Sequence, residues 1–483
     1  MRIKNSENQR TGIFIEGGDA NNLKGKVDSV YIIYEKYKGG VWKNMKKISI
    51  IIFVITSLLI TFGTNHSWAG EIDILVNKLV EKGILSKPEA QQLLNEMQKE
   101  AVILEEQRKQ EVVKEIKDKE LAVPKALKGL EVGMLAYVDY SNGIMPEPGD
   151  RDSSFNHFRI TRGYLTVKKE ILPWLHTRIT IDTHQDSEGD YKERLKYLYA
   201  EFRPPDLGPL TGMKSEVGMG HIPWLDFEEH VNPYRCQGTM AIERAGTFNS
   251  ADTGISLRGD FAGKLENAKE KTGNHHYDGY YGSWHLGVYN GSGYHASEKN
   301  NNKVVEGRFT LRPLPELLPG FQLSYFGIYG EGNDKGLNGD YPDYEVNMGM
   351  LSYEHPWGIL TAQYFQTEGN AKGKWVDADG DALDTEGYSF FGNLRLPFFD
   401  RKFSLFARYD HFDQDDDNKI GHDADYDMYL SGIAWDVYKG NMLLLSYEVT
   451  NYGDDAGTKG NAPILDNQLG DDRKVQAVWQ IKF

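Results

Sequence analysis

The sequence predicts an all-β transmembrane barrel of about 16 antiparallel strands, preceded by a short periplasmic helical segment. Three observations lead to this fold class. Residues 472–483 alternate apolar and polar side chains and end on Phe483, and strand-like runs of this kind recur from residue 130 onward. Most runs have the roughly 9–11 residues that a tilted strand needs to cross a bilayer. Beyond residue 69 no apolar run approaches the ~20 residues of a spanning helix, which leaves a closed barrel as the spanning structure.

The N-terminal part of the chain reads as targeting sequence. Residues 1–44 carry no clear pattern, and we expect them to be an upstream start-codon artefact. Residues 45–69 have the form of a secretory signal peptide, with two lysines, an apolar stretch over 48–62 and small residues at Ser67 and Ala69. The alternative is a membrane anchor, but the apolar stretch is shorter than a spanning helix requires.

Residues 70–128 are expected to form the periplasmic helical segment. Apolar residues recur at helical spacing, and Ser86-Lys-Pro-Glu89 has the pattern of a capping box at the start of a second helix. The heptad register is imperfect. The segment is therefore either a solvated amphipathic helix or a coiled coil that joins barrels into an oligomer.

Residues 129–483 are expected to form the barrel in an outer membrane. Within the strand-like runs, charged side chains fall on the face opposite the apolar ones. An ionised arginine or lysine on the lipid face costs about 2–4 kcal/mol at mid-depth, so these charged residues are expected to line the pore. The predicted pore-lining residues are Arg178, Asp182, Arg258, Asp260, Glu306, Arg308, Arg312 and Arg408.

The connections between the runs alternate in length, as they do in outer-membrane barrels. Most connections on the expected periplasmic side are short turns, but residues 263–279 break this pattern. Either this stretch is a true insertion or the predicted register slips there. The connections expected outside the cell are 141–156, 185–192, 221–251, 291–302, 331–342, 368–385, 412–424 and 452–471.

Short stretches of the barrel region, in the same order along the chain, are similar to the phosphate-selective porin (O and P type) family of Gram-negative outer membranes. They include Phe158-Arg-Ile-Thr-Arg-Gly-Tyr164, Gly218-Met-Gly-His-Ile-Pro-Trp224, Ala251-Asp-Thr-Gly-Ile-Ser-Leu-Arg258 and Phe406-Ala-Arg-Tyr-Asp410. The resemblance implies a sixteen-stranded barrel, a homotrimer and a third outer loop that folds inward. It also implies that the C-terminal strand, with Phe483, Ile481 and Trp479, is the signal read by the barrel-assembly machinery.

The inward loop implied by this resemblance is the long connection 221–251. Its candidate constriction residues are mostly acidic, which favours cations, whereas arginines on the pore face favour anions. Those arginines either form a ladder for anions or pair with lumen carboxylates, and we expect pairing for most of them. The candidate constriction residues are Asp226, Glu228, Glu229, His230 and Arg235.

Composition and motifs limit the other function classes. The net charge of −16 argues against a nucleic-acid partner, and the single cysteine, Cys236, excludes an internal disulfide and a Cys-x-x-Cys-His haem motif. Neither Gly-x-Ser-x-Gly nor His-Glu-x-x-His occurs, so no enzyme activity and no cofactor are expected. No metal site is expected either. The acidic run 377–384 departs from the EF-hand pattern, and His275 and His276 read as polar loop residues.

The sequence therefore favours an outer-membrane porin through which small solutes or ions diffuse passively, with anions such as phosphate among the candidates. Its expected surroundings are outer-membrane lipid and lipopolysaccharide. The alternative is a barrel that sheathes a partner cytochrome in an electron conduit, since the chain itself has no haem motif.

Overall fold

A computed structural model describes residues 80–83, 86–92, 95, 127–186 and 188–483. The chain separates into two compact units, residues 1–122 and 123–483, which are treated individually below. The predicted artefact at 1–44, the signal peptide at 45–69 and most of the segment 70–128 lie outside the described residues.

In the first unit, residues 87–92 are helical, and Ser86 of the predicted capping box directly precedes them. The backbone N–H of Ser86 donates to Glu89 Oε2 at 2.8 Å, and the N–H of Glu89 donates to Ser86 Oγ at 3.5 Å. These reciprocal bonds satisfy backbone donors at the helix start, which confirms the capping box. Among the described residues no helix is both long and apolar enough to cross a membrane.

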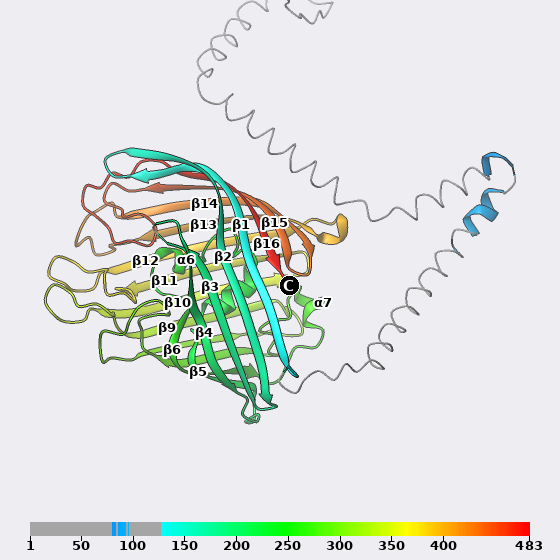
Figure 1. The fold of residues 1–483 in the computed structure, drawn as a ribbon, viewed down its shortest axis with the longest axis horizontal. Coiled ribbons are helices and arrows are strands. Elements are labelled where there is room, and N and C mark those ends of the chain that lie inside the picture. Colours follow the sequence, from blue (N-terminus) through cyan, green and yellow to red (C-terminus); the bar gives the residue numbers. More distant parts are fainter. Residues whose placement is uncertain (1–79, 84–85, 93–94, 96–126, 187) are drawn as a thin grey trace, which may run out of the picture. The chain divides into compact units, whose positions relative to one another are not determined.

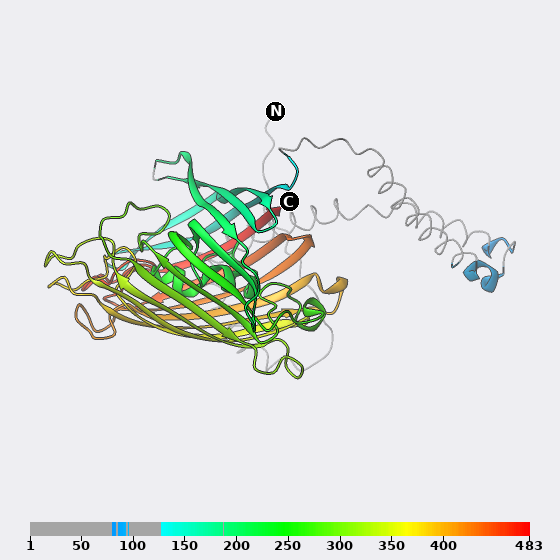
Figure 2. The ribbon, with the colours of Figure 1, turned by 90° about the horizontal axis from the view of Figure 1, so that it is seen from below.

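The second unit is a closed barrel of sixteen antiparallel strands in sequence order, as predicted (Figures 1 and 2). Each predicted run corresponds to one strand. The strands are β1 (Leu130–Glu147), β2 (Arg151–Leu172), β3 (Leu175–Gln185), β4 (Tyr191–Phe202), β5 (Leu210–His221), β6 (Ala251–Phe261), β7 (Gly282–Tyr289), β8 (Val304–Leu311), β9 (Phe321–Glu331), β10 (Asp343–His355), β11 (Gly358–Glu368), β12 (Asp384–Arg395), β13 (Phe403–Asp413), β14 (Asp425–Tyr438), β15 (Asn441–Tyr452) and β16 (Asp472–Lys482).

The last strand closes the barrel against the first. Trp479 of β16 lies opposite Val138 of β1. Beyond the end of β16, the backbone of Phe483 exchanges two hydrogen bonds of 3.2 Å with Met134. Trp479 and Phe483 are exposed on the barrel wall. This pairing removes the free sheet edges of an open sheet.

One predicted connection is wrong. Residues 141–156 are not a loop, because β1 continues to Glu147, β2 begins at Arg151 and the two strands pair along this whole length. The side chains here are largely polar, which hid the strands from a search for apolar alternation. Ladder hydrogen bonds join backbone groups and need no apolar side chain.

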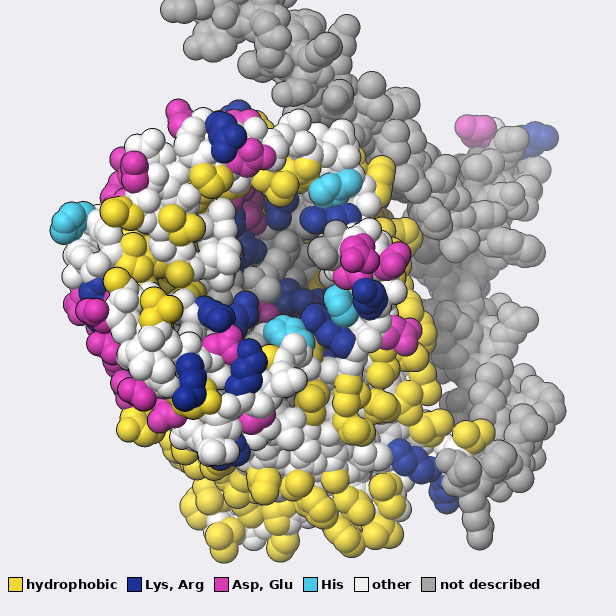
Figure 3. All heavy atoms as spheres, turned by 60° about the vertical axis from the view of Figure 1, so that its left-hand side comes forward, with side chains coloured by type: hydrophobic (Ala, Val, Ile, Leu, Met, Phe, Trp, Pro, Cys, Tyr) yellow, Lys and Arg dark blue, Asp and Glu magenta, His cyan; other side chains and the backbone are white. Residues whose placement is uncertain are grey.

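The outer wall of the barrel carries the apolar side chains of the alternating pattern. Ile255, Leu360 and Phe390 each expose more than half of their surface, whereas their neighbours Ser256 and Ile359 are buried. Figure 3 shows hydrophobic side chains spread over the outer wall. Soluble proteins rarely expose a contiguous apolar area larger than a few hundred Å².

The alternation predicts a polar inner face, but part of the inside of the barrel is apolar. Inward-facing residues of β9–β14 include many apolar side chains, which form a core cluster with side chains of the connection between β5 and β6. That connection contains α5 (Leu225–Val231) and α6 (Ala241–Ala245). The apolar core inside the barrel includes Trp224, Phe227, Ile242, Phe326, Met348, Phe365, Phe391, Phe406 and Met428.

Two further short helices lie in connections at the other end of the strands. They are α7 (Ala268–Thr272), between β6 and β7, and η1 (Phe399–Arg401), between β12 and β13. The connection 262–281, which contains α7, is therefore a true insertion and not a register error. The predicted break in the pattern of short turns is confirmed.

Candidate pore and its constriction

The connection 222–250 lies inside the barrel, as the family resemblance implies for the third outer loop. The ring of Trp224 packs on Phe326 of β9 with 5.5 Å between ring centroids. Tyr234 stacks on Phe406 of β13 at 4.3 Å and accepts a hydrogen bond of 2.6 Å from Asn393 Nδ2 of β12. The loop is therefore fixed to one sector of the wall, and the lumen stays free only on the opposite side.

Four of the five predicted constriction residues line a cavity of about 1090 Å³ beside this loop. They are Asp226, Glu229, His230 and Arg235. Glu228 does not line it. Its side chain is buried under the loop, where Trp224 Nε1 donates to Glu228 Oε2 at 2.6 Å. Burial raises the pKa of Glu228 to about 8, so a constriction role for its charge does not fit this position.

The acidic side chains of the loop are largely neutralised by arginines. Arg235 pairs with Glu229 at 2.8 Å and with Glu243 at 3.2 Å. Asp226 lies 3.5 Å from the guanidinium of Arg258 on β6. Burial alone would raise the pKa of Asp226, but the charges of its histidine and arginine neighbours hold that pKa well below its ordinary range.

The connection 262–281 enters the barrel from the opposite end and meets α5. The hydroxyl of Tyr277 donates to the carboxylate of Asp226, and the Tyr277 ring meets Phe227 edge-on at 5.2 Å. Asn274 Nδ2 donates to the His230 carbonyl at 3.0 Å and to Glu354 of β10 at 2.7 Å. Two connections from opposite ends thus close part of the lumen together.

Three histidine rings lie close together where the two connections meet. The rings of His230 and His276 are 4.0 Å apart, and those of His275 and His276 are 4.2 Å apart. His275 and His276 are exposed residues of an irregular loop, as predicted, and the structure adds that the His276 ring contacts the rings of both His275 and His230.

The wall of β2–β4 carries three neighbouring cations, of which Arg178 lines the open cavity. Arg178 of β3 lies over the ring of Tyr197 at 4.4 Å, and its Nη1 lies 3.1 Å from His221 Nε2. Lys196 of β4 lies over the ring of Tyr164 at 4.5 Å and donates to the Tyr164 hydroxyl at 2.6 Å. Arg162 of β2 lies over the same Tyr164 ring at 4.9 Å.

Among the described residues, these three cations have no carboxylate partner. Within the part of the chain that the structure describes, no Asp or Glu oxygen lies within 4.0 Å of the charged group of Arg162, Arg178 or Lys196. Lys196 is nearly fully buried. A buried charge without a counterion is costly, so aromatic faces and hydroxyls are the groups that stabilise it here.

Sequence reasoning missed Arg162 and Lys196 because two β-bulges change the parity of their strands. In β2, Thr161 has no partner on β1, and in β4, Lys196 has no partner on β3. The first bulge turns both Arg159 and Arg162 inward, although they are three residues apart. A bulge re-aims a side chain in this way, and no sequence signal marked either position.

The structure brings the predicted pore-lining residues to the inside of the barrel in several settings. Asp182 pairs with Arg194 at 2.9 Å, not with Arg178. Asp260 lines a smaller cavity of about 280 Å³ beside the connection 262–281. Glu306 is buried, and its Oε2 has no hydrogen-bond partner.

The expected pairing of arginines with carboxylates holds for two of the five. Arg258 pairs with Glu216 at 2.8 Å, and Arg408 pairs with Asp410. The expectation is wrong for Arg178, for Arg308, whose Nε donates to the Pro223 carbonyl at 3.0 Å, and for Arg312, which donates to the Gly279 carbonyl. Arg308 and Arg312 hold the inward connections through backbone oxygens, which the sequence pattern cannot show.

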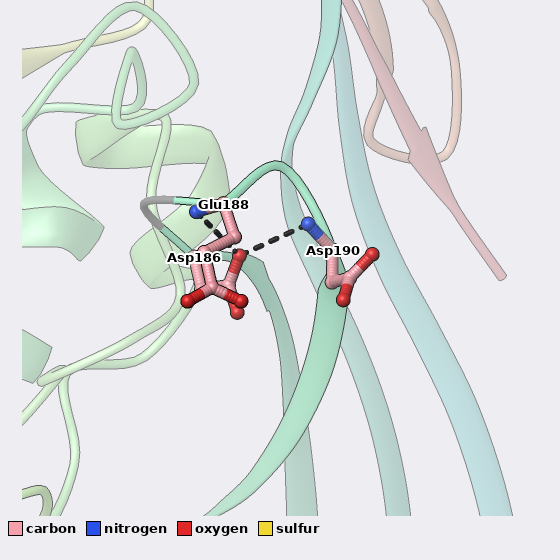
Figure 4. Close-up of side chains that lie close together, drawn as sticks. All are labelled: Asp186, Glu188 and Asp190. Carbon is pink, nitrogen blue, oxygen red and sulfur yellow. Dashed lines mark hydrogen bonds between the residues drawn. The ribbon is translucent and has the colours of Figure 1, made fainter.

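The acidic turns at the strand ends are stabilised by their own backbone. Asp186 Oδ1 accepts the N–H groups of Glu188 at 3.0 Å and Asp190 at 2.9 Å, so these three carboxylates gather in one exposed turn (Figure 4). Asp377 Oδ1 likewise accepts the N–H groups of Asp379, Gly380 and Asp381. These bonds form Asx-type turns, in which the carboxylates of Asp186 and Asp377 stabilise the backbone of the turn.

No family model and no curated protein match the chain. Solved structures are similar to it over the barrel. The anion-selective porin from Comamonas acidovorans is 11% identical, with a TM-score of 0.48 over 73% of this chain and 99% of that chain. OmpF of Salmonella typhi is 12% identical, with a TM-score of 0.49 over 73% and 97%. The outer membrane channel DcaP of Acinetobacter baumannii is 10% identical, with a TM-score of 0.47 over 73% and 97%. Membership of the phosphate-selective family stays a prediction.

Proposed function

We propose that this protein is an outer-membrane porin through which small solutes diffuse passively, with a preference for anions. The observation that carries the preference is Arg178, which lines the open cavity without a carboxylate partner among the described residues, with Arg162 and Lys196 packed against the cavity-lining Tyr164 ring on the same wall. Rings and rows of arginine and lysine favour anions, because they replace part of the water that an anion loses on entry.

The outer surface supports a place in the membrane. Apolar side chains cover the outside of the wall, while charged side chains of the same strands point inward. Lipid on one side and water on the other stabilises this division. A soluble barrel would leave the same apolar belt in water.

The distribution of charge supports anions over cations. The loop carboxylates, from which the sequence suggested a cation preference, are largely paired with Arg235 and Arg258. The wall cations have no such partner. At the end with the long connections, Lys and Arg side chains also gather around the hollow of the barrel (Figure 3). An entering anion therefore meets unpaired positive charge at Arg178 on the wall of the cavity.

No observation favours the cytochrome sheath. The lumen contains an apolar core and two inward connections, and the cavity that remains, about 1090 Å³, accommodates a solute rather than a protein domain.

Several parts of the proposal concern assembly. We include a signal peptide cleaved after Ala69, a periplasmic N-terminal segment, the C-terminal strand as assembly signal, a homotrimer and contact with lipopolysaccharide. Mobility on gels that changes with heating, and chemical crosslinking of unheated protein, test the barrel and the trimer. A product recovered only from the soluble periplasm would contradict the location.

The reversal potential of the purified protein in a planar bilayer under a potassium chloride gradient tests the ion preference. We expect the sign that indicates chloride permeation. The triple variant R162Q/R178Q/K196Q should lose most of this preference. The matched control K439Q, in the turn before β15, should keep it. A cation-selective wild type would overturn the proposed preference.

A further inference from the structure

The open cavity is lined by aromatic rings as well as by cations. Tyr137, Tyr164 and Tyr199 line it on the β1–β4 wall, and His230 and His276 line it on the two inward connections. A channel that selects anions by charge alone needs cations and water, not rings. The rings are therefore a second, independent feature of this cavity.

Cations and rings are adjacent on the wall. Arg162 and Lys196 lie 4.9 and 4.5 Å from the centre of the Tyr164 ring. Arg178 lies 4.4 Å from the centre of the Tyr197 ring, which packs on His221 at 4.3 Å, and His221 in turn meets Tyr199 at 5.6 Å. A solute that fits this spacing has its negative group directly beside a flat apolar group.

We propose that the preferred solutes of this pore are aromatic carboxylates, in which a carboxylate is attached to a planar ring; this inference rests on the proposed channel function. The carboxylate binds the guanidinium of Arg178, which lines the cavity. The ring of the solute contacts the faces and edges of Tyr164 and Tyr199. On the other side of the cavity, His230 and His276 present further ring edges.

Ring contacts distinguish this class from other anions of equal charge. Aromatic pairs contribute about 0.5–1.5 kcal/mol beyond the burial of their area, which corresponds to a factor of roughly two to ten. A saturated ring of similar size and charge buries comparable area but lacks this contribution. Chloride and acetate gain only the electrostatic attraction to the cations of the cavity.

The test compares benzoate with cyclohexanecarboxylate on the wild-type protein in planar bilayers. The two anions have the same charge and nearly the same size. Bi-ionic reversal potentials against chloride should give a permeability for benzoate that is about two- to tenfold higher. Equal permeabilities, with chloride still preferred over potassium, would overturn the inference and leave the proposed porin intact. A cation preference in potassium chloride would overturn the porin proposal itself.

Variants identify the rings that contribute. The double variant Y164L/Y199L should bring the benzoate to cyclohexanecarboxylate ratio close to one, whereas Y164F, which keeps the ring, should retain it. Y329L, which replaces a tyrosine on the outer wall, is the matched control and should keep the wild-type ratio. An unchanged ratio in the double variant would overturn the assignment to these tyrosines. If that variant does not assemble, the wild-type comparison still decides the substrate class.

Discussion

The imidazole rings of His230 and His276 lie 4.0 Å apart, although their connections enter the barrel from opposite ends. This contact joins α5 to the connection 262–281. Burial, together with the neighbouring His230 and His275, lowers the pKa of His276 from 6.5 to about 4. The packed arrangement therefore favours neutral imidazole.

Lowering the pH should loosen the connection 262–281. A histidine with a depressed pKa stabilises the packed state above its ordinary pKa, and this contribution is lost as the pH falls from 6.5 toward 4. The charge of Asp226 raises the pKa of His276 and so reduces this loss of stability, whereas the charge of Lys482 lowers that pKa and increases the loss. Hydrogen exchange of residues 262–281 should be faster at pH 4.5 than at pH 7.5. The variant H276Q should show a smaller change, and an equal change in both proteins would contradict the prediction.

Replacing Glu228 by glutamine should stabilise the barrel at neutral and alkaline pH. Because burial raises the pKa of this carboxyl from 4.5 to about 8, folding is penalised increasingly as the pH rises through that range. The penalty is on the order of 1 kcal/mol per pKa unit. Glutamine keeps an acceptor for Trp224 Nε1 and carries no charge. Thermal unfolding, followed by gel mobility, should separate E228Q from wild type at pH 8 and hardly at pH 5.

Replacing Glu228 by alanine provides the contrast. Alanine leaves the buried Nε1 of Trp224 without its acceptor, which costs about 1–3 kcal/mol. E228A should therefore unfold at a lower temperature than E228Q at every pH. Equal stability of the two variants would mean that the hydrogen bond contributes nothing.

Deleting Thr161 should leave the barrel able to assemble. The deletion removes the bulge and leaves Arg159 and Arg162 two positions apart, so strict alternation still turns both side chains inward. The yield of folded barrel, measured by heat-dependent gel mobility, should stay close to wild type, as it should for T161A, which keeps the bulge. A yield well below wild type for the deletion alone would contradict the prediction.

Cys236 should be unreactive toward maleimide while the inward loop is in place. The thiol is buried, and burial raises its pKa to about 12, so almost no thiolate is present at neutral pH. Labelling of the folded wild type at pH 7 should be negligible and should become complete after unfolding. In a C236S background, D379C on an exposed turn should react at once. Rapid labelling of folded wild type would show that the loop leaves the lumen.

The strands could be predicted from the sequence because lipid and water act on every spanning residue. Alternation at Ile255, Arg258 and Phe309, for example, correctly separates outside from inside. It also revealed that 263–279 is unusually long. The alternation fails where packing inside the barrel replaces water, since Phe406 faces inward and is apolar because Tyr234 covers it.

The candidate site was predicted less completely. Asp226 and Arg235 could be found because the inward loop is the longest connection, but Glu228 could not be assigned to the core from its sequence neighbours. Arg162 and Lys196 could not be predicted at all. Their direction depends on single unpaired residues, and a bulge leaves the residue types around it unchanged.

The core of the lumen and the cations of the pore are on different strands. The apolar packing that holds the inward loop involves chiefly β9–β14, whereas Arg178, Tyr164 and Tyr199, which line the open cavity, are on β2–β4. Substitutions that change which solutes pass can therefore accumulate on one flank without loosening the other. During evolution, such a barrel can therefore change the solutes that it admits while the packing that stabilises the inward loop stays the same.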